Sequence, residues 1–297
     1  MQSLRFLTHG KVNLFLRVLG RRADGFHEIE TILQVIDLSD EIEIVPTTTG
    51  SLEIEMSLKE GIVGEVPSSE DNLVSRAVSS LVEHSPGFDG LKVVVRKGVP
   101  IGAGLGGGSA NAAGALVVLN ELWKMGLEKT RLTDLAAELG SDVPYCVDGG
   151  TALATGRGEK LTSLPSPGKL WFVLGLSNDP LSTAKVYDAW DSLEEISETS
   201  SAPMTMAIGA GEPEEIAACL YNDLERAAFS LRPELRDLKQ SMLDADALGA
   251  CMSGSGPTIA GLAASRSHAQ AIAARVSPSF DAIKVVASRS ECIVRLD

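Results

Sequence analysis

Apolar and polar residues alternate along much of the first hundred residues, which is the pattern expected of half-buried β-strands. On this basis we expect strands over residues 4–19 and 29–36. Two further runs, 40–45 and 51–56, flank the turn-prone segment 46–50 and predict a hairpin. The first part of the chain is therefore expected to be rich in strands.

Helical periodicity appears later and is interleaved with short strands. An alanine- and leucine-rich helical run at 112–125 follows a β-branched strand at 91–96. The pattern changes near residues 164–168, where prolines and a glycine interrupt it, and we place a domain boundary there. The chain is thus expected to form two domains, 1–164 and 165–297.

The second domain alternates strands and helices, as a small α+β sandwich would. Its expected elements are 170–176, 182–193, 214–228, 234–245, 249–262, 267–276 and a closing strand at 283–287. Residues 191–215 hold seven acidic and no basic residues, and we interpret this stretch as a mobile, solvated connection.

Length, composition and cysteine usage limit the class of protein. A chain of 297 residues is long for one hydrophobic core, and 44% hydrophobic content suits a well-packed protein. Charges break the longest apolar runs well before the length of a membrane span, and the N-terminus lacks a signal-peptide core, so a cytoplasmic location is expected. The four cysteines are far apart and predict neither a zinc site nor a disulfide framework.

Net charge narrows the range of partners. A formal charge of −14 argues against a general nucleic-acid-binding protein. The first 25 residues carry one acid, Asp24, against five basic residues, which are Arg5, Lys11, Arg17, Arg21 and Arg22. One basic corner on an acidic protein can attract a small anionic ligand, although an ordinary solvated patch has the same composition.

The most distinctive segment spans residues 100–111 and reads Pro-Ile-Gly-Ala-Gly-Leu-Gly-Gly-Gly-Ser-Ala-Asn. Its five glycines let the backbone approach a ligand closely, and the helix that follows offers unpaired N–H groups to a phosphate. Ser109 and Asn111 suit the helix N-terminus as caps, and Gly107 lies in the tightest part of an expected surface loop. We interpret the segment as a phosphate-binding loop rather than a flexible connector, although it matches neither the Walker A nor the Rossmann pattern.

Three further features each allow two interpretations. Lys11 and Asn13 lie on one face of a strand, which makes an inward polar site plausible, although a strand lysine is normally at the surface. Asp142 precedes Val-Pro at the start of a helix, and its position alone favours a helix cap. The second glycine segment, Ser253–Pro257, is either a ligand-binding loop or a tight turn.

Four stretches together resemble the GHMP kinase superfamily: Lys11–Leu16, Asp24–His27, Pro100–Asn111 and Ser253–Pro257. The Arg-x-Asp-Gly-Phe-His segment is most similar to the members that act on 4-diphosphocytidyl-2-C-methyl-D-erythritol. The resemblance implies an α+β, two-domain GHMP kinase fold, with an N-terminal domain like ribosomal protein S5 domain 2 and a ferredoxin-like C-terminal domain. It also implies ATP-dependent phosphorylation of the substrate's 2-hydroxyl, in the non-mevalonate route to isoprenoids, in a cleft between the domains.

The resemblance also implies roles for residues of this chain. Asp142 matches the family's catalytic base, and Lys11 matches the residue that supports it. The ATP site would be formed by Asn72 together with Pro100, Ile101, Gly102, Ala103, Gly104, Leu105, Gly106, Gly107, Gly108, Ser109, Ala110 and Asn111. Magnesium is implied with ATP, but the sequence shows no dedicated metal-binding carboxylate, so phosphates and water are expected to hold most of the ion's ligand positions.

A second group of residues would bind the cytidine-diphosphate-linked methylerythritol. This group consists of Asn13, Phe26, His27, Thr183, Tyr187, Gly254 and Ser255. His27 offers one ring donor and one ring acceptor, which suits the edge of cytosine. The family usually has tyrosine where this chain has Phe26, a change that keeps stacking but removes a hydroxyl. Tyr187 has a second interpretation, as one more core aromatic on a helix.

Two competing hypotheses remain open. Another GHMP kinase, of homoserine or mevalonate type, would share the ATP loop but would not require Asp24–His27 together with Tyr187. A catalytically inactive binding homologue would share the fold, but the retention of Lys11, Asp142 and Ser109 argues against it. We expect small-molecule ligands, no nucleic-acid or membrane partner, and either a monomer or a weak homodimer.

Overall fold

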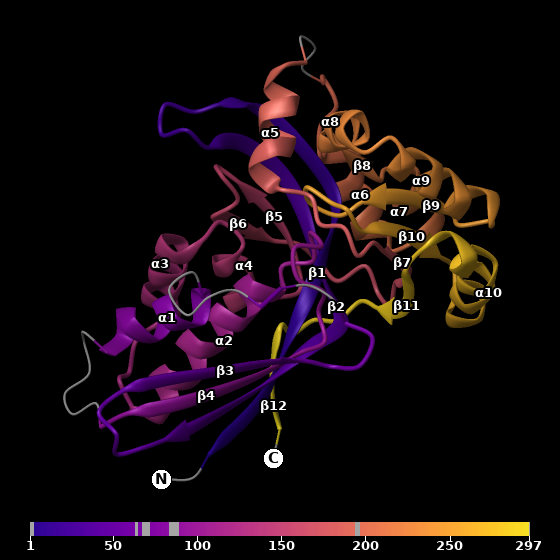
Figure 1. Ribbon diagram of the computed structural model, residues 1–297. Coiled ribbons are helices and arrows are strands. Elements are labelled where there is room, and N and C mark those ends of the chain that lie inside the picture. The colour runs from indigo at the N-terminus through magenta and orange to yellow at the C-terminus, as the bar shows by residue number, and fades with distance from the viewer. Residues whose placement is uncertain (1–2, 63–64, 67–71, 83–88, 194–196, 297) are drawn as a thin grey trace.

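The structure, a computed structural model, consists of two β-sheets with helices packed against them (Figure 1). It describes residues 3–62, 65–66, 72–82, 89–193 and 197–296. None of the helices in these ranges is long and apolar enough to cross a membrane.

Two long strands, β1 (Leu4–Arg21) and β2 (His27–Pro46), form a hairpin that runs through the centre of the molecule (Figure 1). They organise a sheet whose described strands follow the order β12-β1-β2-β4-β3, with β8 beside β1 and the β5–β6 pair beside β2. The bounds of the remaining strands are Leu52–Leu58 (β3), Leu91–Lys97 (β4), Thr151–Thr155 (β5), Lys160–Ser163 (β6), Tyr221–Asn222 (β8) and Ile293–Leu296 (β12).

The predicted hairpin between residues 40–45 and 51–56 is wrong. β4 pairs with β2, and β3 lies outside it, parallel to β4, with Ile54 opposite Val93. Parallel neighbours need a crossover connection of a dozen or more residues, and here the connection contains helix α1 (Leu73–Val82). Alternation indicates which face of a strand is buried but does not identify its neighbour, so the pattern alone could not exclude this order.

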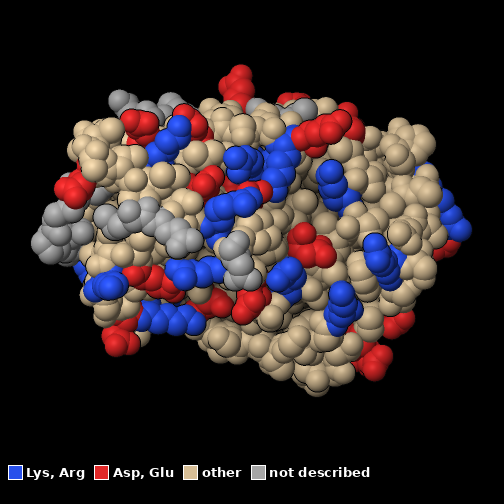
Figure 2. All heavy atoms as spheres, turned by 90° about the horizontal axis from the view of Figure 1, so that it is seen from below, with Lys and Arg blue, Asp and Glu red and all other residues tan. Residues whose placement is uncertain are grey.

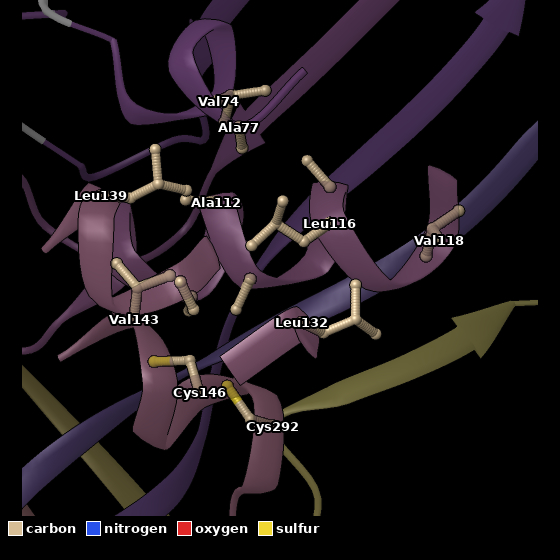
Figure 3. Packing of buried hydrophobic residues seen from close by; sticks show 14 of the residues in the cluster. Val74, Ala77, Ala112, Leu116, Val118, Leu132, Leu139, Val143, Cys146 and Cys292 are labelled. Carbon is tan, nitrogen blue, oxygen red and sulfur yellow. The ribbon is translucent and has the colours of Figure 1, made fainter. Parts of the chain in front are cut away.

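Four helices cover the first sheet and share one hydrophobic core with it. They are α1, α2 (Gly107–Leu122), α3 (Lys129–Leu139) and α4 (Val143–Asp148). Figure 3 shows side chains from all four helices around α2. A Cβ atom on Gly114 would lie 2.6 Å from the Phe6 ring, so α2 packs directly on β1. This contact holds the N-terminal end of α2 over the sheet.

A second sheet has the described strand order β11-β7-β10-β9, formed by residues after position 165. Its strands are β7 (Trp171–Leu176), β9 (Gly249–Met252), β10 (Ile259–Ala263) and β11 (Ala282–Ala287). The helices of this part of the chain are α5 (Thr183–Asp191), α6 (Ala202–Ala210), α7 (Pro213–Ala218), α8 (Leu224–Leu231), α9 (Glu234–Asp244) and α10 (Arg266–Val276). Two short strands from this half, β8 and β12, pair with β1 in the first sheet. The strand at 282–287 therefore does not finish the chain.

The interpretation of residues 191–215 as a mobile connection is wrong for most of the part that is described. Helix α6 lies within it, and Met204 and Ile208 are buried in the core beneath the second sheet. The acidic residues of the stretch lie outside α6, so the composition of the whole stretch concealed the apolar helix in its middle. Residues 194–196 are outside the described residues.

The basic residues near the N-terminus do not form one corner. Four of the five are distributed along an 18-residue strand, so that Arg5 pairs with Glu41 near one end of β1 and Arg21 pairs with Asp191 at the other. On the face seen in Figure 2, Lys and Arg side chains are interspersed with Asp and Glu. Of the five basic residues, Lys11 and Arg21 line the same cleft.

Candidate active site

The glycine-rich segment is half loop and half helix. Helix α2 begins at Gly107, and the preceding Gly106 adopts a left-handed conformation with φ of 70°. Ser109 and Asn111 are therefore inside the helix, and the expectation that they cap it is wrong. The first helical turn consists of Gly-Gly-Ser-Ala, and the N–H groups of its first three residues have no acceptor within the helix, whereas the Ala110 N–H bonds to the Gly106 carbonyl at 2.9 Å.

Asn111 is buried and only half satisfied. Its Oδ1 accepts a hydrogen bond from the Thr8 hydroxyl at 2.7 Å, whereas its Nδ2 has no partner among the described residues. An unpaired buried donor costs about 1–3 kcal/mol. Asn111 lines a cleft beside the glycine segment, so a ligand that reaches this buried side chain would meet an unpaired donor.

The two glycine segments pack against each other. Gly104 has φ of 77°, and a Cβ atom there would lie 2.1 Å from the Ser253 carbonyl oxygen. Ser253 in turn donates its hydroxyl to the Gly104 carbonyl at 3.0 Å. The second glycine segment is therefore more than an isolated turn, because it packs directly against the first glycine segment.

Gly107 does not lie in a surface loop, contrary to expectation. It is buried, and a Cβ atom there would lie 2.9 Å from Val99. Gly108 is different, since it is exposed and its Cβ would meet nothing closer than Leu73 at 3.8 Å. Gly107 therefore packs closely against other protein atoms, whereas Gly108 faces the open side of the turn.

Two clefts meet at the glycine segment. The first, of about 620 Å³, contains Lys11, Asp142, His27 and Tyr187 among its lining residues. The second, of about 450 Å³, is lined by most of the glycine segment together with Asn72, Lys97 and Asn111. Both volumes are typical of small-molecule sites. The residues that line both clefts are Gly104, Gly106, Ser109 and Thr183.

A polar cluster lies where the clefts meet. The Lys11 ammonium is 3.4 Å from Asp142 Oδ2, and it donates to Asn13 Oδ1 at 2.8 Å and to the Gly104 carbonyl at 3.0 Å. Asn13 donates its Nδ2 to the Thr31 hydroxyl at 2.8 Å, which fixes the amide. The Lys11 side chain is only 5% exposed, whereas that of Asp142 is 33% exposed. The predicted placement of Lys11 and Asn13 on one face is confirmed.

Irregular strand pairing helps to position this cluster. The register of β1 against β2 shifts between His9 and Lys11, and again between Asn13 and Phe15. Such bulges re-aim side chains and are frequent beside active sites. The Lys11 backbone N–H also bonds to the Leu105 carbonyl at 2.9 Å, which joins the strand to the glycine segment.

Asp142 occupies the N-cap position of α4 but does not cap it through its side chain. The carboxylate accepts no hydrogen bond from a described backbone N–H of that helix. The cap interpretation is therefore wrong for the side chain, although the position is as predicted. The carboxylate is instead directed into the first cleft, near Lys11.

The far end of the first cleft is aromatic. The His27 ring stacks on Tyr187 with centroids 4.6 Å apart, and the Arg157 guanidinium lies 4.9 Å from the centre of the Phe26 ring. Burial, with the charge of Asp142 adding to it, raises the pKa of Tyr187 well above its ordinary value, so the phenol stays neutral. Because Tyr187 also lines the first cleft, it is not solely a core aromatic.

The second cleft contains two further polar anchors. Asn72 accepts a hydrogen bond from the Val74 N–H at 2.9 Å, so it caps α1 while lining the cleft. Lys97 forms a buried ion pair with Asp40, and burial lowers the pKa of Lys97 from its ordinary value. Asp40 also accepts the N–H groups of Gly98 and Val99, which fixes the strand end that leads into the glycine segment.

Four charged residues of this region were not identified as site residues from the sequence. Lys97 lines the second cleft, Arg157 and Asp188 line the first, and Asp191 contacts His27. Arg157 stands between two glycines, the one local signal that could have suggested a functional turn. Thr183 and Ser255, which were predicted, hydrogen-bond to each other at 2.8 Å at the edge of the first cleft. No group of three His, Cys, Asp or Glu side chains suited to a metal ion occurs within the described ranges.

Comparisons with known proteins agree with this geometry. Residues 72–150 match the model for the GHMP kinases N terminal domain, and residues 204–282 match that for the GHMP kinases C terminal domain. The chain is 42% identical over 280 residues to the 4-diphosphocytidyl-2-C-methyl-D-erythritol kinase of Pelotomaculum thermopropionicum, covering 94% of this chain and 96% of that one.

Solved structures give the same fold. A crystal structure of 4-(cytidine 5'-diphospho)-2C-methyl-D-erythritol kinase is similar with a TM-score of 0.80 and 31% identity, over 96% of this chain and 98% of the other. A homoserine kinase from Cytophaga hutchinsonii has the same TM-score at 22% identity, over 100% and 98% of the chains. Backbone similarity alone therefore does not separate the substrates of these kinases, and the cleft residues must do so.

Proposed function

The chain belongs to the 4-diphosphocytidyl-2-C-methyl-D-erythritol kinase family of GHMP kinases, and from this premise we propose that it transfers the γ-phosphoryl group of ATP to the 2-hydroxyl of that substrate. The observation that carries the proposal is the Lys11–Asp142 pair, 3.4 Å apart, in the first cleft next to the glycine residues shared with the second. In the cell the reaction would serve the non-mevalonate route to isoprenoid precursors in the cytoplasm.

ATP occupies the second cleft in this proposal. The free N–H groups at the start of α2, and the unpaired Asn111 Nδ2, supply donors for phosphate oxygens. The open side of Gly108 leaves room for the phosphates against the backbone. The γ-phosphoryl group then reaches the junction formed by Gly104, Gly106 and Ser109.

Asp142 acts as the general base. Its partly exposed carboxylate accepts the proton of the attacking hydroxyl as the oxygen approaches phosphorus. Two of the three Lys11 N–H donors are used by Asn13 and the Gly104 carbonyl, which leaves the third for Asp142 and the reacting oxygens. The positive charge faces the base and stabilises the charge that develops on the phosphoryl group.

Magnesium would enter with ATP and supply charge neutralisation on the phosphates. The residues present suit an ion held mainly by phosphate oxygens and water, because they offer isolated oxygen ligands rather than a carboxylate cage. Ser109 and Asp142 are two of the oxygen-bearing side chains that line the first cleft, and they would help to hold the ion.

The cytidine end of the substrate lies against Phe26, His27 and Tyr187. Their aromatic faces suit stacking on a base, and His27 adds polar ring nitrogens. Arg157 and Arg21 line the same cleft and complement the diphosphate. Homoserine and mevalonate contain no nucleobase, so neither would contact this aromatic wall of the cleft.

The test is a coupled assay of ADP release with Mg-ATP and three acceptors: 4-diphosphocytidyl-2-C-methyl-D-erythritol, homoserine and mevalonate. We expect turnover with the first alone. Turnover with either of the others would move the chain to another kinase of the same fold. No turnover with any acceptor, together with ATP binding, would favour an inactive homologue.

A substitution at Gly108 tests the ATP cleft. Gly108→Val places a side chain over the first turn of α2 without contact to protein closer than Leu73, so the melting temperature should stay near that of wild type. The Kd for ATP, measured by calorimetry, should rise by at least about tenfold, or about 1.4 kcal/mol. Gly107→Val is the contrasting variant, since its clash with Val99 should lower the melting temperature. Unchanged ATP affinity in Gly108→Val would remove this turn from the phosphate site.

A substitution at Tyr187 tests the aromatic wall. Base stacking is worth about 1–3 kcal/mol, so Tyr187→Ala should raise the KM for the cytidine substrate by roughly five- to a hundred-fold. The KM for ATP should stay nearly unchanged, because Tyr187 lines only the first cleft. Tyr187→Phe, which keeps the ring, is the matched control and should stay close to wild type. An equal rise in both KM values would refute the assignment.

A further inference from the structure

A single turn of α5 supplies the contacts that hold His27. The ring stacks on Tyr187, meets Trp190 edge-on at 5.8 Å, and places Nε2 at 2.7 Å from Asp191 Oδ1. Figure 1 shows this helix beside the end of the β1–β2 hairpin, where His27 begins β2. The His27 side chain is 8% exposed, so its plane and one nitrogen are fixed.

Asp191 stands where an acid is unfavourable for the helix itself. It is the last residue of α5, and a carboxylate at a helix C-terminus opposes the macrodipole. Arg21 compensates by donating to Asp191 Oδ2 at 3.1 Å, while His27 occupies Oδ1. The carboxylate of Asp191 therefore does not stabilise α5, yet both of its oxygens form hydrogen bonds. This combination indicates that Asp191 serves His27 rather than its own helix.

The carboxylate determines which ring nitrogen carries hydrogen. An ionised carboxylate only accepts hydrogen bonds, so the hydrogen must lie on Nε2 of His27. In the neutral imidazole, Nδ1 is then an acceptor. Nδ1 has no hydrogen-bond partner among the described residues, and His27 lines the first cleft, so this nitrogen is available to a ligand.

We propose that Asp191 is a positioning residue that fixes the tautomer of His27, so that Nδ1 presents an acceptor to the exocyclic amine of cytosine and discriminates against uracil. The inference rests on the proposed function, which puts a pyrimidine in this cleft. Uracil has a carbonyl oxygen where cytosine has the amine, and two acceptors would then face each other. Arg21 belongs to the same device, because it fixes the second carboxylate oxygen.

The tautomer is tested first, without substrate. The ¹⁵N shifts of the imidazole nitrogens are measured on the full chain in mildly alkaline buffer. We expect the Nε2–H form of His27 in the wild type. In Asp191→Asn the single amide oxygen serves Arg21 or His27 but not both, so the amide N–H₂ can donate to Nε2 and the Nδ1–H form should appear. Asp244→Asn, at the C-terminus of α9, is the matched control and should leave the spectrum of His27 unchanged.

Base discrimination is tested by titrating CDP and UDP into the protein with a non-hydrolysable ATP analogue filling the second cleft. We expect wild type to bind CDP more tightly, and Asp191→Asn to lose about tenfold in CDP affinity with UDP unchanged or improved. An unchanged tautomer, or equal losses for CDP and UDP, would overturn the inference, because a merely structural contact predicts the latter. A failed kinase assay with the cytidine substrate would instead overturn the proposed function, since the tautomer is read independently of turnover.

Discussion

Asp142→Asn is expected to fold and bind ATP as wild type does, but to lose kcat by about 10²–10⁴-fold, the usual worth of general-base assistance. A neutral amide cannot hold the proton of the attacking hydroxyl. The substitution should leave the melting temperature nearly unchanged, because Lys11 keeps its bonds to Asn13 and the Gly104 carbonyl. The measurement is kcat with both substrates saturating, alongside thermal unfolding and ATP calorimetry.

Two variants control this experiment. Asp142→Ala should lose as much activity as Asp142→Asn and no more stability, because the side chain makes no capping bond to α4. Asp148→Asn removes the acid at the other end of the same helix, where it pairs with Lys129, and kcat should be unchanged. If Asp142→Asn kept near-wild-type kcat, the hydroxyl proton would have to pass to the phosphate or to water, and Asp142 would not be the base.

The sequence was sufficient to place the residues whose arrangement is decided locally. Glycines between a strand and a helix predict a phosphate-binding turn because only a few backbone geometries connect such elements. The period of two placed Lys11 and Asn13 together, and their contact at 2.8 Å follows from that period. The predicted start of α2 was too late in the sequence. The helix begins with two glycines, which have a low helix propensity, and the packing of Gly107 on Val99 determines where it starts.

The residues that were missed depend on partners distant in the chain. Asp191 acts on His27 across 164 positions, and Lys97 is neutralised by Asp40 across 57. Periodicity reports which side of an element is buried, and it carries no information about which other element covers that side. The same limit explains the wrong hairpin, where β4 comes between two strands that are close in sequence.

Lys11→Met is expected to lower kcat by about 10²–10³-fold, the usual cost of removing one preorganised group that stabilises transition-state charge. Methionine keeps much of the side-chain volume but removes the charge and all three donors. Asn13 Oδ1 then loses its donor in a buried place, whereas the Gly104 carbonyl keeps the Ser253 hydroxyl, so stability should fall by about 1–3 kcal/mol. The assay must therefore be run well below the melting temperature of the variant. Lys284→Met, in β11 and away from both clefts, is the matched control.

The double variant Lys11→Met with Asp142→Asn shows whether the two residues act together as one catalytic unit or contribute independently. Their charged atoms are 3.4 Å apart, and residues that act as a unit show strongly non-additive losses. If Lys11 acts mainly by positioning Asp142 and by stabilising the charge produced as Asp142 takes the proton, most of its effect disappears once the base is gone. The double variant should then retain a kcat within about tenfold of the weaker single variant. A loss equal to the product of the two single losses would mean that Lys11 acts on the phosphoryl group alone, independently of the base.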